Sequence, residues 1–500
     1  MTVTRLEWSK LLTSVRRKDL AGGRRQADQL GAAGTRTEIE RDYDRILFSA
    51  PIRRLADKTQ VFPLDKNDSV RNRLTHSHEV SNLARSIGVA LVHGDTGVPT
   101  DELVRRDLPS MLAAIGLAHD VGNPPFGHQG EHAISSWFRK NEAKTLDFSK
   151  EIAAGEVTET DARRMKADYL NFEGNAQALR ILTKLQILND NFGLNVSCGT
   201  LGALMKYPVT SDKVDSSHVA TKKFGCFHSE VSACQQIWEE TGLAQGVRHP
   251  LAYIMEACDD IAYSVLDAED AVKKGLVSFV DVVNFLEAHC GEDGVVDRLL
   301  NGVKNKDGDW QKKGAKAHHE KHREHDLSPA ELNDISMQMF RVLAIGEMVT
   351  AVTAAFSENY DAIMTGTFEG DLISSSVARR LCKGLKQCSF KHAFQHKSVL
   401  EIELKGHNII HSLMDMMWPA IVMRGDPLET DGFGDDAGVF EKYVFNRISE
   451  NYRRVFEDKE NALPLGYKRC QLLGDMISGM TDSYAVDLEG ELRSLKTVGM

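Results

Sequence analysis

Several features that mark other classes of protein are scarce or missing in this chain. Its 500 residues include only 12 prolines, and no uninterrupted run of about 18 apolar residues, the length of a membrane-spanning helix, occurs in it. The eight cysteines are scattered without a Cys-x-x-Cys pair, which is typical of reduced thiols rather than a disulfide framework. The first residues contain no apolar segment of a secretory signal. We therefore expect a cytoplasmic protein that has no contact with a membrane.

An excess of positive charge is also missing. The 61 lysines and arginines are outnumbered by 72 aspartates and glutamates, which gives a net charge of −11. This balance provides no general attraction for nucleic acid. An anionic substrate must therefore be bound by local basic residues or by a metal ion. The apolar content of 42% and the charged content of 27% are ordinary for a globular protein.

The chain contains long stretches in which apolar residues recur with a helical period, so we expect a mostly α-helical protein. A Ser-Pro-Ala-Glu capping box at 328–331 predicts the start of a long helix. The predicted helices cover residues 49–60, 75–92, 109–120, 250–274 and 328–364. Residues 399–406 predict one short strand, residues 301–327 a solvated loop, and residues 1–40 an extended or partly ordered basic arm.

Two histidines on different predicted helices face the protein interior. His76 is followed by apolar residues at positions 80, 83, 87 and 91, so it lies on the buried face of its helix, whereas His78 faces outward or sideways. His119 follows apolar or small residues at 112, 115 and 116, and so also faces inward. Its neighbour Asp120 lies at the end of the helix, before a Pro-Pro turn, where adjacent side chains can share one ion.

A third predicted helix, at 250–274, carries several carboxylates on one face. Asp259 shares that face with Tyr263 and Asp267, and buried carboxylates require partners. Asp260 is an alternative to Asp259, since only the phase of the helix separates them. Two imidazoles and two carboxylates suit a divalent metal ion, which polarises a phosphate and activates water. On spacing alone, hydrogen-bonded core residues explain the same pattern, so the metal site is a hypothesis at this stage.

Six segments carry a resemblance to a known family. They are IRRLADKTQVFP (52–63), RLTHS (73–77), HDVGNPPFGHQGE (119–131), FEGNAQ (172–177), IMEACDDIAY (254–263) and ISGMTD (477–482). Together with the order His76, His119-Asp120, Asp259, they resemble the bacterial deoxyguanosine triphosphate triphosphohydrolases (dGTPases) of the HD-domain phosphohydrolase superfamily. The resemblance implies a helical HD core at 41–290, a helical C-terminal portion at 291–500, and hydrolysis of dGTP to deoxyguanosine and triphosphate. It also implies that His76, His119, Asp120 and Asp259 hold the metal.

The residues around this site have expected roles. A histidine backed by a carboxylate is a general acid/base pair, and His128 with Glu131 has that composition, although capping of the next helix explains His128 equally well. The resemblance favours catalysis at both. Arg73 lies one helical turn before His76 and is within reach of a phosphate. The resemblance further implies that Asn175 and Lys206 bind phosphate, that Gln60, Tyr263 and Asp267 bind the deoxyribose, and that Glu403 binds the base.

Other readings remain open on the sequence. A broad-specificity dNTPase, or another HD nucleotide hydrolase, has the same core motifs. A nucleic-acid-binding regulator with a remnant HD site is an alternative of another class, suggested by the basic arm and by the histidines of 318–325. The ligand set favours Mg or Mn and also accepts Fe, Co, Ni or Zn. The resemblance implies a homo-oligomer, with a hexamer as one option. Single-stranded DNA is a further candidate, as an effector, which the net charge neither supports nor excludes.

Overall fold

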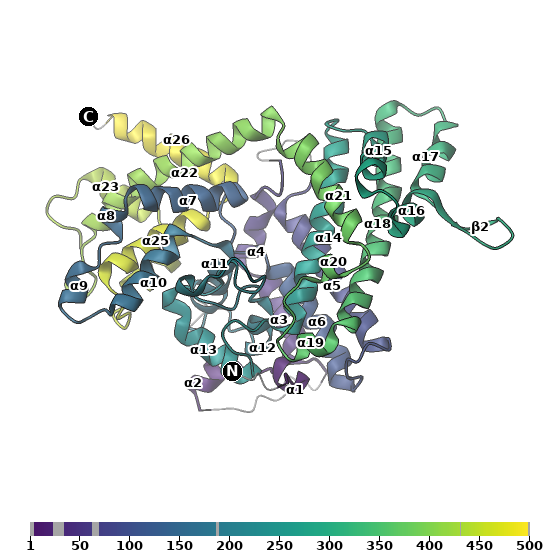
Figure 1. Ribbon diagram of the computed structural model, residues 1–500. Helices are drawn as coiled ribbons and strands as arrows, with labels where there is room; N and C mark the ends of the chain where they lie inside the picture. The colour runs from purple at the N-terminus through teal and green to yellow at the C-terminus, as the bar shows by residue number, and fades with distance from the viewer. Residues whose placement is uncertain (1–4, 24–34, 63–69, 187–189, 431, 499–500) are drawn as a thin grey trace.

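A computed structural model describes residues 5–23, 35–62, 70–186, 190–430 and 432–498, and it is built from helices with one small hairpin (Figure 1). Apolar side chains form two clusters. The helices that contribute to the first are α1 (Trp8–Leu11), α3 (Glu38–Leu47), α4 (Ala50–Arg54), α5 (Arg73–His93), α6 (Glu102–Ala118), α12 (Cys198–Leu204), α13 (Val231–Thr241), α14 (Pro250–Lys273), α15 (Phe279–Cys290), α16 (Gly294–Asn301), α17 (Ala315–Arg323), α18 (Pro329–Glu358), α19 (Tyr360–Met364), α20 (Leu372–Ser375) and α21 (Arg379–Ser389).

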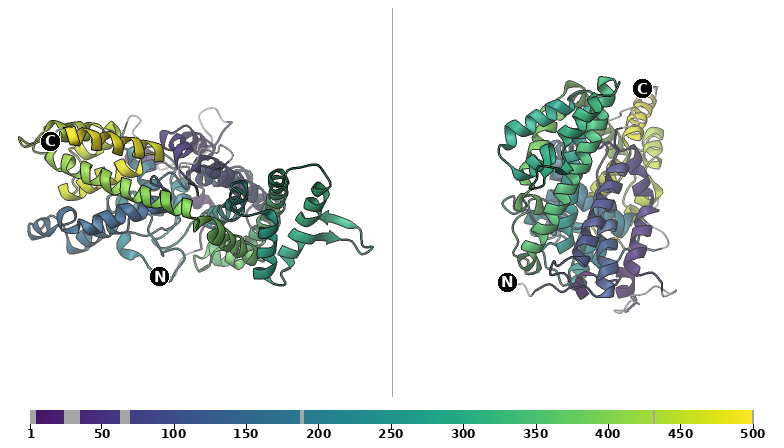
Figure 2. Two further views of the ribbon diagram at one scale, coloured as in Figure 1. Left: turned by 90° about the horizontal axis from the view of Figure 1, so that it is seen from above. Right: turned by 90° about the vertical axis from the view of Figure 1, so that its right-hand side faces the viewer.

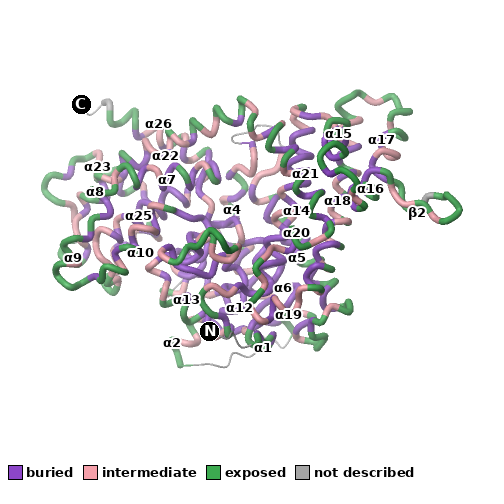
Figure 3. The backbone as a smooth tube through the Cα atoms, viewed as in Figure 1, coloured by how far each residue is buried: buried purple, intermediate pink, exposed green. Residues whose placement is uncertain are grey.

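The second cluster lies at the left of Figure 1. Its helices, with the short ones beside it, are α7 (Gly127–Lys140), α8 (Glu142–Thr145), α9 (Ser149–Ala153), α10 (Glu159–Leu170), α22 (Lys397–Met423), α23 (Val439–Asn446), α24 (Glu450–Glu457), α25 (Leu465–Ser478) and α26 (Asp482–Val498). Helix α11 (Gly174–Arg180) contributes to both clusters, and α2 (Arg17–Ala21) packs beside α13. Figure 3 shows that buried residues fill the interior of both groups of helices and the middle of the molecule, whereas exposed residues lie mainly at its periphery.

Helices α5, α6 and α14 form the part of the fold that carries the expected metal ligands. The side chains of Asn72 and Asp101 accept backbone N–H groups at the first turns of α5 and α6, which fixes where both begin. Helices α5 and α6 approach closely at Gly116, where a Cβ atom would lie 2.8 Å from the Cα of Ser81. Only glycine permits this contact, which brings the end of α6 close to α5.

The predicted helices are found, with shifted ends. Helices α5 and α14 match the expected ranges, whereas α6 begins seven residues earlier than expected and includes Pro109. The helix predicted for 328–364 is interrupted at Asn359, and α4 is followed by a single 3₁₀ turn that ends at Asp57. A mostly α-helical fold, as the sequence predicts, is therefore confirmed.

Two predictions of local secondary structure are wrong. Residues 399–406 are not a strand but part of α22, in which Val399, Gly406 and Ile410 are buried and Leu404 is exposed. The segment 301–327 is not a loop: β1 (Gly302–Lys304) and β2 (Trp310–Lys313) pair in an antiparallel hairpin, and α17 follows it. The hairpin projects from the body of the molecule in Figure 1 and in the left view of Figure 2.

The amino-terminal segment is folded where the structure describes it. Trp8 and Leu11 of α1 are buried, and the guanidinium of Arg16 contacts the carboxylates of Glu38 and Asp42. Residues 5–23 are therefore packed rather than extended, contrary to the predicted arm. The basic pair Arg24-Arg25 lies outside the described residues.

Helix α18 is, by length and composition, the one helix of the described segments that is apolar enough to cross a membrane. Of its most apolar window, 39% is buried, and it packs along α14. Arg341 on α18 bonds to the buried carboxylate of Glu269 on α14, so α18 is joined to α14 by an ion pair as well as by packing.

Candidate metal centre and its cavity

Three of the expected ligands converge from three helices. The Nε2 atom of His76 on α5 lies 3.2 Å from Oδ1 of Asp259 on α14, and Nε2 of His119, at the end of α6, lies 3.6 Å from the same oxygen. One ligand atom from each residue lies within 4.8 Å of the others. A single divalent ion placed among these atoms can therefore be reached by all three side chains with small adjustments.

Asp120 lies at the edge of this cluster. Its Oδ1 atom is 3.5 Å from Nε2 of His119 and accepts a 2.5 Å hydrogen bond from the amide of Asn123. The other oxygen accepts a 2.6 Å bond from the guanidinium of Arg73. The carboxylate is thus held in place by two neighbours, with one oxygen facing His119. Asp260, the alternative to Asp259, points elsewhere and pairs with Lys386 at 2.6 Å.

The chemistry of the donor atoms fits a cation. The Nδ1 atom of His119 lies 2.8 Å from the carbonyl oxygen of Gly116, so it donates there and leaves the lone pair on Nε2. That Nε2 atom is buried and makes no hydrogen bond. Burial alone would lower the pKa of His119, but the carboxylates of Asp120 and Asp259 outweigh burial and raise it to about 9. The carboxylates thus favour a positive charge at Nε2, and a bound metal ion would supply that charge in place of a proton.

His128 and Glu131 form a pair at the start of α7. The Nδ1 atom of His128 lies 2.8 Å from Oε2 of Glu131, whose other oxygen accepts a 2.7 Å bond from the backbone N–H of Gly174. The hydrogen bond to the carboxylate raises the pKa of His128 above its ordinary value. Glu131 is buried, whereas the His128 side chain is 81% exposed. The buried carboxylate of Glu131 therefore orients the His128 ring, whose exposed edge can contact a ligand.

A cavity of about 350 Å³ opens over the cluster. Nine of the expected site residues line it: Gln60, Arg73, His119, Asp120, His128, Asn175, Lys206, Asp259 and Tyr263. The other four expected residues, His76, Glu131, Asp267 and Glu403, do not line it. His76 and Glu131 lie behind lining residues and act on them through the contacts described above.

Cationic side chains surround the metal cluster. Lys206 lies 3.7 Å from Asp259 and 3.6 Å from the buried Glu256, and Arg73 is held by Asp120. Three further lysines, which the sequence analysis did not identify, also line the cavity: Lys222, Lys223 and Lys386. The adjacent lysines at 222–223 can be seen in the sequence. No sequence pattern indicates, however, that they line the cavity beside the metal cluster.

Two buried polar atoms near the expected sugar site make no hydrogen bond. They are Oε1 of Gln60 and Oδ2 of Asp267. Burial, the largest influence, and the nearby carboxylate of Asp270 raise the pKa of Asp267 well above its ordinary value. Buried polar atoms normally have partners, so free ones beside a cavity are suited to the hydroxyl groups of a ligand.

Glu403 lies apart from this group of residues. It is half-buried on α22, and its carboxylate lies 3.5 Å from the side-chain amide of Gln129 on α7. Its expected contact with a base therefore stays a prediction.

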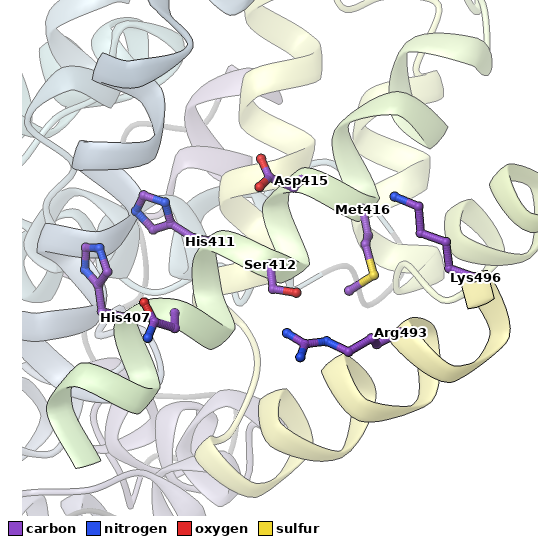
Figure 4. A pocket seen from close by; sticks show the side chains of 8 residues that line it. His407, His411, Ser412, Asp415, Met416, Arg493 and Lys496 are labelled. Atoms are coloured by element: carbon purple, nitrogen blue, oxygen red, sulfur yellow. The ribbon is translucent and has the colours of Figure 1, made fainter. Parts of the chain in front are cut away.

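A second hollow, of about 480 Å³, lies between α22 and α26 (Figure 4). It contains none of the expected site residues. Ser412 and Arg493 face one another across it, whereas His411 pairs with Ser136 and Asp415 accepts a bond from the Trp137 indole. Several of its polar groups are thus satisfied within the protein, and this hollow offers no comparable chemistry.

Comparison with known proteins agrees with this geometry. Residues 73–183, which include His76, His119, Asp120 and the His128/Glu131 pair, match the family described as HD domain. A deoxyguanosinetriphosphate triphosphohydrolase-like protein of Listeria innocua is 37% identical over 498 residues, which cover 98% of this chain and all of the relative. The chain belongs to the deoxyguanosinetriphosphate triphosphohydrolase family.

Other members of this family match at similar length. A probable deoxyguanosinetriphosphate triphosphohydrolase of Pseudomonas aeruginosa is 32% identical over 92% of the chain and 93% of the relative. A deoxyguanosinetriphosphate triphosphohydrolase of Serratia proteamaculans is 33% identical over 90% and 92%. Membership confirms the predicted superfamily and identifies the chain as an HD phosphohydrolase, a class that uses a divalent metal ion.

Proposed function

We propose that this protein hydrolyses dGTP to deoxyguanosine and intact triphosphate. The observation that supports this most is the combination of a metal-type cluster with a cavity lined by five cationic side chains: Arg73, Lys206, Lys222, Lys223 and Lys386. A nucleoside triphosphate carries about four negative charges, more than one divalent ion offsets. The names of the relatives support the same reaction.

The residues divide into groups by what they would bind. His76, His119, Asp120 and Asp259 would hold a divalent ion, with Mg or Mn as first choices, which when bound polarises the α-phosphate. Arg73 and Lys206 lie directly beside this cluster and would bind phosphate oxygens. Asn175, at the first turn of α11, would donate its side-chain amide to the same oxygens.

The proton is handled by His128. Because Nδ1 donates to Glu131, Nε2 of the neutral ring carries the lone pair and accepts a proton from water in the cavity. The water oxygen bonds to the α-phosphorus, the bond from phosphorus to the sugar 5′-oxygen breaks, and that oxygen takes up a proton. Glu131 keeps the ring oriented and stabilises its charged form.

The deoxyribose would lie between α14 and the segment at residue 60. Tyr263, whose ring lies 5.8 Å from the Lys386 ammonium, would pack where a ribose 2′-hydroxyl would project. Gln60 and Asp267 would use their free oxygens for the 3′-hydroxyl. Such a site rejects ribonucleotides by steric exclusion and by unpaired polar groups. Glu403 would accept from the N1–H and N2–H groups of guanine.

Product analysis tests this proposal. The Mn²⁺-loaded protein is incubated with each of the four dNTPs and four NTPs, and the products are separated by anion exchange. We expect deoxyguanosine and unbroken triphosphate from dGTP, and loss of both turnover and metal binding in His119→Ala and Asp259→Ala. Release of orthophosphate or pyrophosphate would refute the reaction, and equal rates with all dNTPs would replace dGTP by a broad specificity.

A further inference from the structure

A carboxylate outside the cavity is bonded to two segments that lead into it. Asp482, the first residue of α26, is buried, and its Oδ1 accepts a 2.9 Å hydrogen bond from the backbone N–H of Phe126. Its Oδ2 accepts a 3.0 Å bond from the N–H of Thr59 and another from the Thr59 hydroxyl. One side chain near the C-terminus thus ties together two backbone segments that lie 356 and 423 residues away.

Each of these segments carries a cavity residue next to the bond. Gln60 follows Thr59 directly, and His128 comes two residues after Phe126. The segment that contains Thr59 also supports Arg73, because the backbone N–H of Arg73 donates to the carbonyl of Lys58 at 3.0 Å. A shift in the bonds from Asp482 to Phe126 or to Thr59 therefore moves a side chain that lines the cavity.

The backbone at Phe126 requires such support. Its φ of 61° and ψ of 18° lie in the left-handed region, which a residue with a large side chain adopts only when its surroundings impose it. The next residue, Gly127, is also left-handed, and a Cβ there would lie 2.5 Å from the guanidinium of Arg73. This double turn aims the start of α7, and with it His128, at the cavity.

A second buried group joins the same elements. The ammonium of Lys58 donates to the carbonyl of Asn123 at 2.5 Å and to that of Ser478, the last residue of α25, at 2.7 Å. The turn at 120–127 is therefore joined to the last residue of α25 through Lys58, and to the first residue of α26 through the bond between Phe126 and Asp482. Helices α25 and α26 contribute no side chain to the cavity lining, yet their residues bond to the backbone that shapes it.

We propose that Asp482 is a positioning residue of the reaction, which sets the location of His128 and Gln60 through the backbone of Phe126 and Thr59. This role rests on the proposed function only for the identity of the reaction. It predicts that removal of the carboxylate changes turnover and substrate binding. The same removal should leave the metal cluster intact.

The test replaces Asp482 by asparagine, which keeps the shape and removes one acceptor oxygen. Asp168→Asn is the matched control, because Asp168 is also buried and also accepts three hydrogen bonds, from Ser211, His228 and Tyr467, none of which lines the cavity. For each protein, kcat and KM are measured per folded molecule on the nucleotide that the unaltered protein hydrolyses. Mn²⁺ affinity is measured by titration.

We expect D482N to lower kcat about 10- to 100-fold, because misplacing a catalytic group by about 1 Å has an effect of that size. Mn²⁺ affinity should be unchanged, and D168N should retain kcat and KM even where its melting temperature falls. The role is refuted if D482N keeps kcat and KM within about twofold, or if D168N loses activity equally. Failure of the proposed function appears separately, as the wrong products from the unaltered protein.

A milder variant covers the case in which D482N does not fold. Thr59→Val removes one of the three hydrogen bonds to Asp482 at a half-buried position and leaves the charge in place. Loss of that bond should raise KM about 2- to 10-fold through Gln60, with an unchanged affinity for Mn²⁺. A KM equal to that of the unaltered protein would contradict the proposed link.

Discussion

At the scale of single residues, each group of the candidate site depends on a neighbour that orients it. His119 is fixed by the carbonyl of Gly116, Asp120 by Arg73 and Asn123, and His128 by Glu131. These partners decide which nitrogen or oxygen remains free for a ligand. The chemistry of the site therefore extends one shell beyond the side chains that line the cavity.

The His128/Glu131 pair gives a prediction on pH dependence. The carboxylate raises the pKa of His128, so Glu131→Gln should lower that pKa and move the limb of the kcat/KM profile governed by His128 to lower pH. The rate at the optimum should also fall about 10- to 100-fold, because the amide no longer stabilises the charged ring. A profile from pH 5 to 9 checks this, and an unmoved limb would exclude His128 as the titrating group.

The sequence predicted which helical residues face the protein interior. It did not predict which residues from distant loops and helices line the cavity. Helical spacing placed His76 and His119 on inward faces and left Asp260 as an alternative to Asp259. In the structure the two histidines converge with Asp259. Lys223 and Lys386 lie on a loop and on α21, and no local period indicates that they meet at the cavity. The assignment of all these residues as ligands or substrate contacts stays a proposal.

At the scale of elements, the contact between α22 and the turn before α7 is a close one. A Cβ atom at Gly406 would lie 2.5 Å from the ring of Phe126, the residue whose left-handed backbone precedes His128. Helix α22 can therefore cover the turn only with glycine at this position. The contact joins packing of the second apolar cluster to the geometry of the catalytic pair.

Gly406→Ala should lower the free energy of unfolding by about 1–3 kcal/mol, the usual effect of overpacking a fitted contact. Gly346→Ala is the control, since nothing lies within 4 Å of a Cβ at that helical position, and it should stabilise by about 0.5–1 kcal/mol. Thermal unfolding of both variants measures the difference. Equal effects would show that the Phe126 contact is not restrictive.

Capping residues predicted the starts of helices correctly. Alternation of apolar residues, by contrast, predicted a strand where the structure has a helix. Ser328 with Glu331 and Pro250 mark the observed starts of α18 and α14. In 399–406 the alternating pattern resembles a strand, but Leu400 and Leu404 are exposed because this end of α22 lies at the protein surface. A short amphipathic segment has no period of its own that outweighs its packing partners.

At the scale of the whole molecule, buried ion pairs join elements distant in the sequence. Arg180 on α11 donates to Asp475 on α25 and to Glu230 beside α13. The expected division between a core at 41–290 and a C-terminal portion at 291–500 stays a prediction, as do the homo-oligomer and single-stranded DNA as an effector. The cytoplasmic location likewise stays a prediction.

The central claim is that side chains from α5, α6 and α14 hold one divalent cation. Crystals grown with Mn²⁺ and measured for anomalous scattering test it most directly. The claim predicts one strong peak at about 2.0–2.3 Å from Nε2 of His76 and His119 and from carboxylate oxygens of Asp120 and Asp259, and no such peak in His119→Ala. A Mn²⁺ peak elsewhere, or none at this cluster in protein that hydrolyses nucleotide, would contradict it.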